Sequence, residues 1–124
     1  MDHMDHMGYE TFLDRIVDYG IVAATADYKE GPKLSGSIKG FEACRNKTPE
    51  QIVDEWSMAS GKIQQFREAP ELDNYWYWNC YQLEIEWVLN CLSVFLNKPL
   101  LGHLPTARGA MKAYEVLGFQ GVLG

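Results

Sequence analysis

The segment from Tyr75 to Asn97 constrains the fold more than any other part of the chain. It reads YWYWNCYQLEIEWVLNCLSVFLN and contains neither proline nor glycine. Wound at about 3.6 residues per turn, it places apolar side chains around most of its circumference. A surface helix carries a much narrower apolar stripe, so this helix has to be surrounded by other protein. The sequence therefore predicts a buried central helix over about residues 74–97.

Helix start and stop signals predict three further main helices and one short helix. The first covers about residues 9–30 and ends at Gly31-Pro32, and the short one covers about residues 41–46. The next begins at the capping-box sequence Thr48-Pro49-Glu50-Gln51 and ends near residue 67. The last covers residues 107–117. Since no alternating run predicts a strand, the predicted fold class is all-α, a compact bundle of four main helices plus one short helix.

Two of these helices have a predicted inward face, defined by three- and four-residue steps. On the first helix the face consists of Phe12, Ile16, Tyr19, Ala23 and Ala26. On the helix after Thr48 it consists of Ile52, Trp56, Ala59, Ile63 and Phe66. Residues 1–8 contain the repeat MDHMDHM and are expected to be a disordered terminus or one added to the natural chain. Residues 9–124 are expected to form a single helical domain, as their number suits one core.

Charge and cysteine content indicate what the protein does not bind and where it works. The formal net charge is −6 and the pI is about 4.9, which argues against nucleic acid because phosphate binding needs a basic surface. Membrane insertion is also unexpected, since Glu84 and Glu86 near the middle of the long helix are costly in lipid. Cys44, Cys80 and Cys91 form no CxxC pair and are expected to be reduced thiols. A cytoplasmic location is therefore expected.

The polar residues of the long helix fall in one stripe about 80° wide. Its members are Asn79, Gln82, Glu86, Asn90, Ser93 and Asn97. One interpretation is a solvated face. The other is the lining of a pocket for a small polar ligand, bound by Asn79, Gln82, Glu86 and Asn90, because amides around one carboxylate offer both donors and acceptors.

Glu84 lies nearly opposite this stripe, among apolar residues. We expect it to be buried, and to be satisfied by an arginine or a tyrosine hydroxyl because an unpaired buried carboxylate is costly. The alternative is a catalytic acid or base. Glu84 and Glu86 point about 160° apart and cannot chelate together. No metal site and no cofactor is therefore predicted.

The aromatic beginning of the long helix is the candidate interface. Tyr75, Trp76 and Trp78 are residue types that protein interfaces favour. The leading functional hypothesis is a small binding or interaction module without catalytic chemistry, whose partner is a second copy of itself, as a homodimer, or another protein. The alternative is a small enzyme or small-molecule-binding protein whose pocket uses the Asn79, Gln82, Glu86 and Asn90 stripe. Whether the chain catalyses a reaction is left open.

Overall fold

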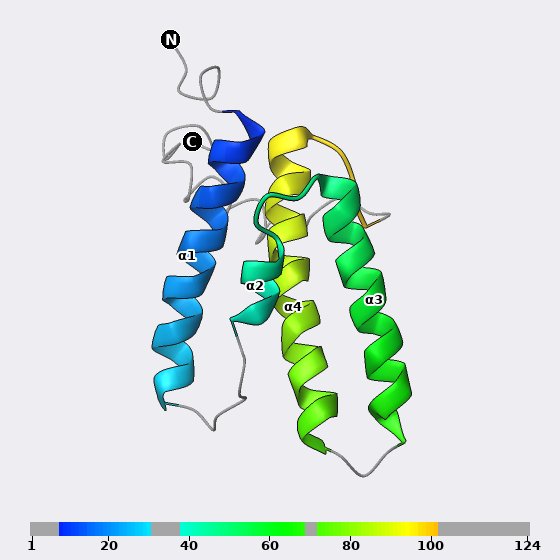
Figure 1. Cartoon of the computed structure of the whole chain (residues 1–124). Helices are drawn as coiled ribbons and strands as arrows, with labels where there is room; N and C mark the ends of the chain where they lie inside the picture. Colours follow the sequence, from blue (N-terminus) through cyan, green and yellow to red (C-terminus); the bar gives the residue numbers. More distant parts are fainter. Residues whose placement is uncertain (1–7, 31–37, 69–71, 102–124) are drawn as a thin grey trace.

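The computed structural model of the chain describes residues 8–30, 38–68 and 72–101. These residues form helices α1 (Tyr9–Glu30), α2 (Lys39–Ala43), α3 (Pro49–Arg67) and α4 (Leu72–Leu96), and no strand occurs among them. The long helices lie side by side, with α4 between α1 and α3 and the short α2 against α4 (Figure 1). The predicted all-α bundle is confirmed. The helix predicted over residues 107–117 lies outside the described part of the chain.

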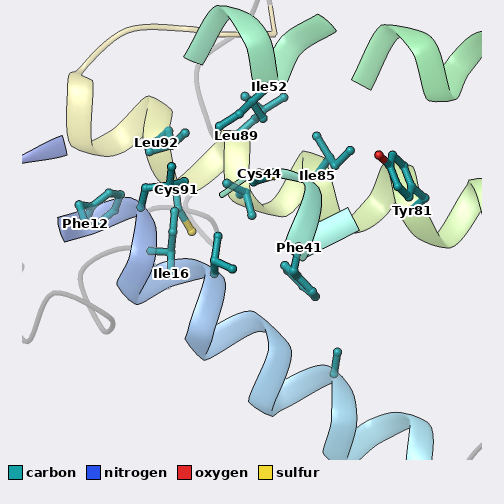
Figure 2. Close-up of a cluster of buried hydrophobic side chains, with 14 of the residues drawn as sticks. Phe12, Ile16, Phe41, Cys44, Ile52, Tyr81, Ile85, Leu89, Cys91 and Leu92 are labelled. Carbon is teal, nitrogen blue, oxygen red and sulfur yellow. The ribbon is translucent and has the colours of Figure 1, made fainter. Parts of the chain in front are cut away.

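Helix α4 is the centre of the fold, as its apolar circumference predicts. The three other described helices all pack on it. Five of its side chains are completely buried: Ile85, Val88, Leu89, Cys91 and Leu92. They meet side chains of the other helices in one continuous core (Figure 2).

Helix α4 ends one residue earlier than predicted, because Asn97 adopts a left-handed conformation with φ 53°. The amide of Lys98 then donates to the carbonyl of Ser93 at 3.0 Å, and the amide of Asn97 donates to the carbonyl of Val94 at 3.2 Å. These two bonds define a Schellman cap, in which asparagine is the usual substitute for glycine.

The inward face of α1 differs from the prediction in its second half. Phe12 and Ile16 are completely buried, but Ala23 is exposed and Ala24 is buried in its place. The buried face turns through Gly20, where the ring of Phe41 from α2 takes the space that a side chain would need. The face is therefore set by the arrival of α2, which the periodicity of α1 does not contain. The side chain of Ala26 is outside the described part of the structure.

Helix α3 begins as predicted. Thr48 accepts a hydrogen bond through Oγ1 from the amide of Gln51 at 3.2 Å, and Gln51 accepts one through Oε1 from the amide of Thr48 at 2.9 Å. This is the complete capping box. On the face toward α4, Ile52, Ala59 and Ile63 are buried, whereas Trp56 and Phe66 are half-buried.

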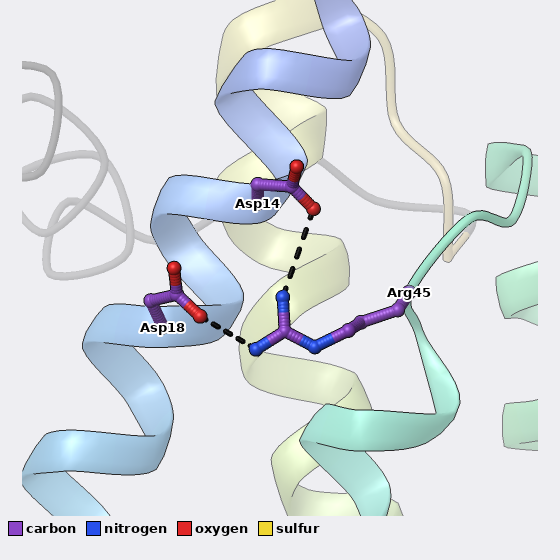
Figure 3. A network of polar contacts seen from close by, with 3 residues as sticks. All are labelled: Asp14, Asp18 and Arg45. Carbon is purple, nitrogen blue, oxygen red and sulfur yellow. Dashed lines mark hydrogen bonds and ion pairs between the residues drawn. The ribbon is translucent and has the colours of Figure 1, made fainter.

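Polar contacts connect the turn between α2 and α3 to α1. Arg45 pairs with Asp14 at 3.7 Å and with Asp18 at 2.5 Å (Figure 3). Tyr9 donates a hydrogen bond to the carbonyl of Lys47 at 2.7 Å. The ion pairs are largely exposed, so each contributes about 1 kcal/mol or less. Helix α2 covers residues 39–43 rather than 41–46, because Asn46 has φ 60° and ends the helical conformation.

Candidate functional site

Glu84 is buried as expected, with 4% of its surface exposed. Its carboxylate accepts a hydrogen bond from the backbone amide of Gly40 at 2.9 Å and one from the thiol of Cys80 at 3.5 Å. These are not the arginine and tyrosine contacts expected from the sequence: Arg45 pairs with carboxylates of α1, and the hydroxyl of Tyr81 donates to Glu55 at 2.7 Å. The expectation of burial was right, and the expected type of partner does not match the contacts described.

The bond between Gly40 and Glu84 has a clear physical cause. Gly40 is in the first turn of α2, where backbone amides have no partner inside the helix. Glu84 supplies an acceptor for one of these amides and also places negative charge at the positive end of the helix. A side chain at position 40 would lie 2.8 Å from Glu84 Cβ and Oε1 and closer still to the carbonyl of Tyr81. Only glycine allows α2 to approach α4 this closely.

The cysteine next to this cluster is not suited to nucleophilic chemistry. Cys44 is completely buried, and its thiol contacts the carbonyl of Gly40 at 3.4 Å. Burial raises the pKa of Cys44 to about 12, with the positive charge of Lys47 opposing the shift. The thiolate is the reactive form of cysteine, and at neutral pH this residue stays a thiol. The Glu84 cluster therefore holds α2 on α4 and offers no activated group.

The polar stripe of α4 makes several of its hydrogen bonds inside the protein. Gln82 donates to the carbonyl of Trp56 at 3.2 Å and also contacts the hydroxyl of Ser60, both on α3. Asn79 donates to the carbonyl of Tyr75 at 2.8 Å. Glu86 and Asn90 are half-buried beside them. Asn79 and Gln82 thus use donors internally that a bound ligand would otherwise meet.

Ser93 belongs to the core rather than to a polar surface. It is 4% exposed, donates to the carbonyl of Leu89 at 2.8 Å and accepts from the amide of Leu100 at 3.2 Å. The second bond fixes the chain where it turns back after α4. Nothing in the local sequence distinguishes this serine from a solvated one, because its acceptor role depends on the path of the chain seven residues later.

Two shallow pockets occur away from the stripe. One, of about 260 Å³, lies between the start of α1 and the turn before α3, and the other, of about 330 Å³, lies between the start of α3 and the chain after α4. None of the four predicted ligand-binding residues lines either pocket. Within the described ranges, no group of three histidine, cysteine or acidic side chains is arranged to hold a metal ion.

The remaining side of α4 exposes large apolar side chains. Trp76 is 50% exposed and Leu83 is 63% exposed. They are seven residues apart, so they lie within about 20° of each other and about 10 Å apart along the helix. Tyr75 packs edge-on against Trp76, with the ring centroids 5.1 Å apart. We call this surface, made of Tyr75, Trp76, Asn79, Leu83 and Glu86, the Trp76–Leu83 face.

The third predicted interface residue belongs to a different surface. Trp78 is half-buried, packs against the core and lies edge-on to Tyr81 with the ring centroids 4.9 Å apart. Lys62 of α3 lies over its ring, with Nζ 5.8 Å from the centroid. Trp78 therefore contributes to the contact between α3 and α4, and the accessible part of the predicted interface is formed by Tyr75 and Trp76.

Comparison of the chain with protein-family models, with curated proteins and with solved structures gives no match. None of the described helices has the length and hydropathy needed to cross a membrane. The argument about function therefore rests on the chain's own residues, and the feature that the fold does not account for is the Trp76–Leu83 face.

Proposed function

We propose that this chain is a small interaction module that associates with a second copy of itself through the Trp76–Leu83 face. One observation carries the proposal: a half-exposed tryptophan and a largely exposed leucine share one face of the central helix. Single exposed apolar residues are normal on protein surfaces, but two large ones at a helical repeat indicate contact with another helix. Tryptophan is also among the residues most enriched at binding hot spots.

The chemistry of the other surfaces supports binding over catalysis. The buried carboxylate of Glu84 is held by Gly40 and Cys80. The Cys44 thiol is protonated at neutral pH because its pKa is raised to about 12. An enzyme needs a concave site with convergent polar groups, whereas Asn79 and Gln82 direct donors into the fold.

The exposed area sets the expected strength of association. Burying the exposed half of Trp76 removes roughly 100 Å² from water and is worth about 2.5 kcal/mol. Burying the exposed part of Leu83 adds about 1–2 kcal/mol. Two copies double these gains, and association costs at least about 4 kcal/mol. With contributions from the neighbouring residues, we expect a dissociation constant between about 10 µM and 1 mM.

Sedimentation equilibrium tests this proposal. The wild-type chain should rise from a mass near 14.2 kDa toward twice that value as its concentration passes through the expected dissociation constant. Trp76→Ser and Leu83→Ser should each weaken the association by at least about tenfold, since each change acts twice in a symmetric dimer. Val22→Ser is the matched control, because Val22 is 71% exposed on α1. A constant monomer mass up to about 1 mM would refute the proposal.

A further inference from the structure

The spacing of Trp76 and Leu83 is self-complementary in one direction only. Their midpoint on α4 lies between Asn79 and Cys80. If a two-fold axis passes through this midpoint and a second α4 runs antiparallel, Trp76 of each copy meets Leu83 of the other. A large ring then faces a smaller aliphatic side chain, which lets the two layers interdigitate. In a parallel pair, Trp76 faces Trp76 and the two large rings compete for the same space.

The polar residues of the face fit the same arrangement. Tyr75 and Glu86 lie within about 20° of each other on the helix, on one side of the Trp76–Leu83 line. In an antiparallel pair, residues on the same side of each helix approach one another. Their mean position is one residue from the two-fold axis, so the Tyr75 hydroxyl of one copy reaches the Glu86 carboxylate of the other. In a parallel pair the two groups are separated by about 16 Å along the axis.

Charge also favours this orientation. The centre of the face is neutral, since Asn79 is the polar residue nearest the axis and its amide already donates to Tyr75 O. Two antiparallel helices align their macrodipoles favourably, and two parallel helices do not. We infer that the partner of this chain is a second copy whose α4 packs antiparallel across the Trp76–Leu83 face, with Tyr75 donating to Glu86 across the axis. This inference rests on the proposed function.

A spin-label distance measurement separates the two orientations. A nitroxide placed on Asn90→Cys lies about 31 Å along the axis from its counterpart in the antiparallel dimer, and only about 10 Å away across a parallel one. The native thiols of Cys44, Cys80 and Cys91 are buried. The unmodified wild-type chain, which should take up little label, is therefore the control. The measurement uses the full chain at concentrations where sedimentation shows the dimer.

Each outcome has one meaning. A distance near 30 Å supports the antiparallel pair, and a distance near 10 Å overturns it while leaving self-association intact. A wild-type chain that sediments as a monomer overturns the proposed function and this inference together. A dimer that Trp76→Ser does not weaken uses another surface, which also overturns both.

A double-mutant cycle tests the contact between Tyr75 and Glu86. Tyr75→Phe and Glu86→Gln should each raise the dissociation constant on the order of tenfold, as expected for two copies of a hydrogen bond to a charged group. The double variant should be no weaker than either single variant, because both remove the same bond. Tyr77→Phe, on another side of α4, is the control and should leave association unchanged. Additive effects of the two changes would exclude the contact.

Discussion

Gly40 is the position at which a single methyl group should do the most damage to this fold. Its amide donates to the buried Glu84 carboxylate at 2.9 Å. An added Cβ would lie 2.8 Å from Glu84 Cβ and Oε1 and would collide with the backbone carbonyl of Tyr81. A backbone carbonyl inside the central helix cannot swing aside as a flexible side chain can. Gly40→Ala therefore has to push α2 away from α4.

The size of the effect follows from three contributions. Overpacking at a tight contact costs about 1–3 kcal/mol. Lengthening or breaking the bond between the amide and the buried carboxylate costs about 1.5–3 kcal/mol. Replacing glycine by alanine in a helix returns at most about 1 kcal/mol. We therefore expect Gly40→Ala to lower the free energy of unfolding by about 2–4 kcal/mol.

Urea denaturation followed by circular dichroism measures this change, and Gly61 provides the matched control. Gly61 lies within α3, and nothing is within 4 Å of the Cβ that would be added there. Gly61→Ala should therefore stabilise the protein by about 0.5–1 kcal/mol through helix propensity alone. If Gly40→Ala unfolds at the wild-type urea concentration with an unchanged slope, the close approach of α2 to α4 is not part of the native state.

Three other perturbations have defined outcomes. Thr48→Ala should lower the free energy of unfolding by about 1 kcal/mol through loss of the N-cap, and an unchanged urea midpoint would contradict the observed capping box. Trp56→Ala should cost about 3 kcal/mol. Trp56→Phe should cost much less, because it removes the buried indole N–H that has no partner in the described structure; equal losses would show that the indole N–H is satisfied. Burial raises the pKa of Tyr9 from 10.0 to about 12, so its contribution to stability is complete below about pH 10 and declines as the pH rises toward 12. Stability measured by urea denaturation should fall less steeply over that range in Tyr9→Phe than in wild type, and identical slopes would refute the assignment.

The features that the sequence predicted correctly are those that depend on neighbouring residues. The capping box at Thr48 needs only four consecutive residues, and it is present in full. The burial of Glu84 follows from its position among apolar residues of the same helix. The shift from Ala23 to Ala24 on α1 shows the limit of such reasoning. Both candidates are alanines, so the pattern there carries little amphipathic signal, and the choice is made by the ring of Phe41 on Gly20.

The partners of the polar residues could not be predicted, because they come from distant parts of the chain. Glu84 is bound by an amide 44 residues away, and Gln82 by a serine 22 residues away. Any glycine amide can donate a hydrogen bond, so no residue type marks Gly40 in advance. The amide-rich stripe was therefore interpreted as a surface or a pocket, although Gln82 joins two helices.

Positions 83 and 84 carry the opposite of the polarity that their surroundings favour. Glu84 is 4% exposed, and Leu83 is 63% exposed. Glu84 has a structural reason, because it satisfies an amide at the start of α2. Leu83 has none within the fold, since a polar residue at an exposed helix position usually changes stability by no more than about 0.5 kcal/mol. The same reasoning applies to the exposed half of Trp76. The apolar character of this face is accounted for only when a second helix covers it, and that is why the proposed function is placed there and not at the buried carboxylate.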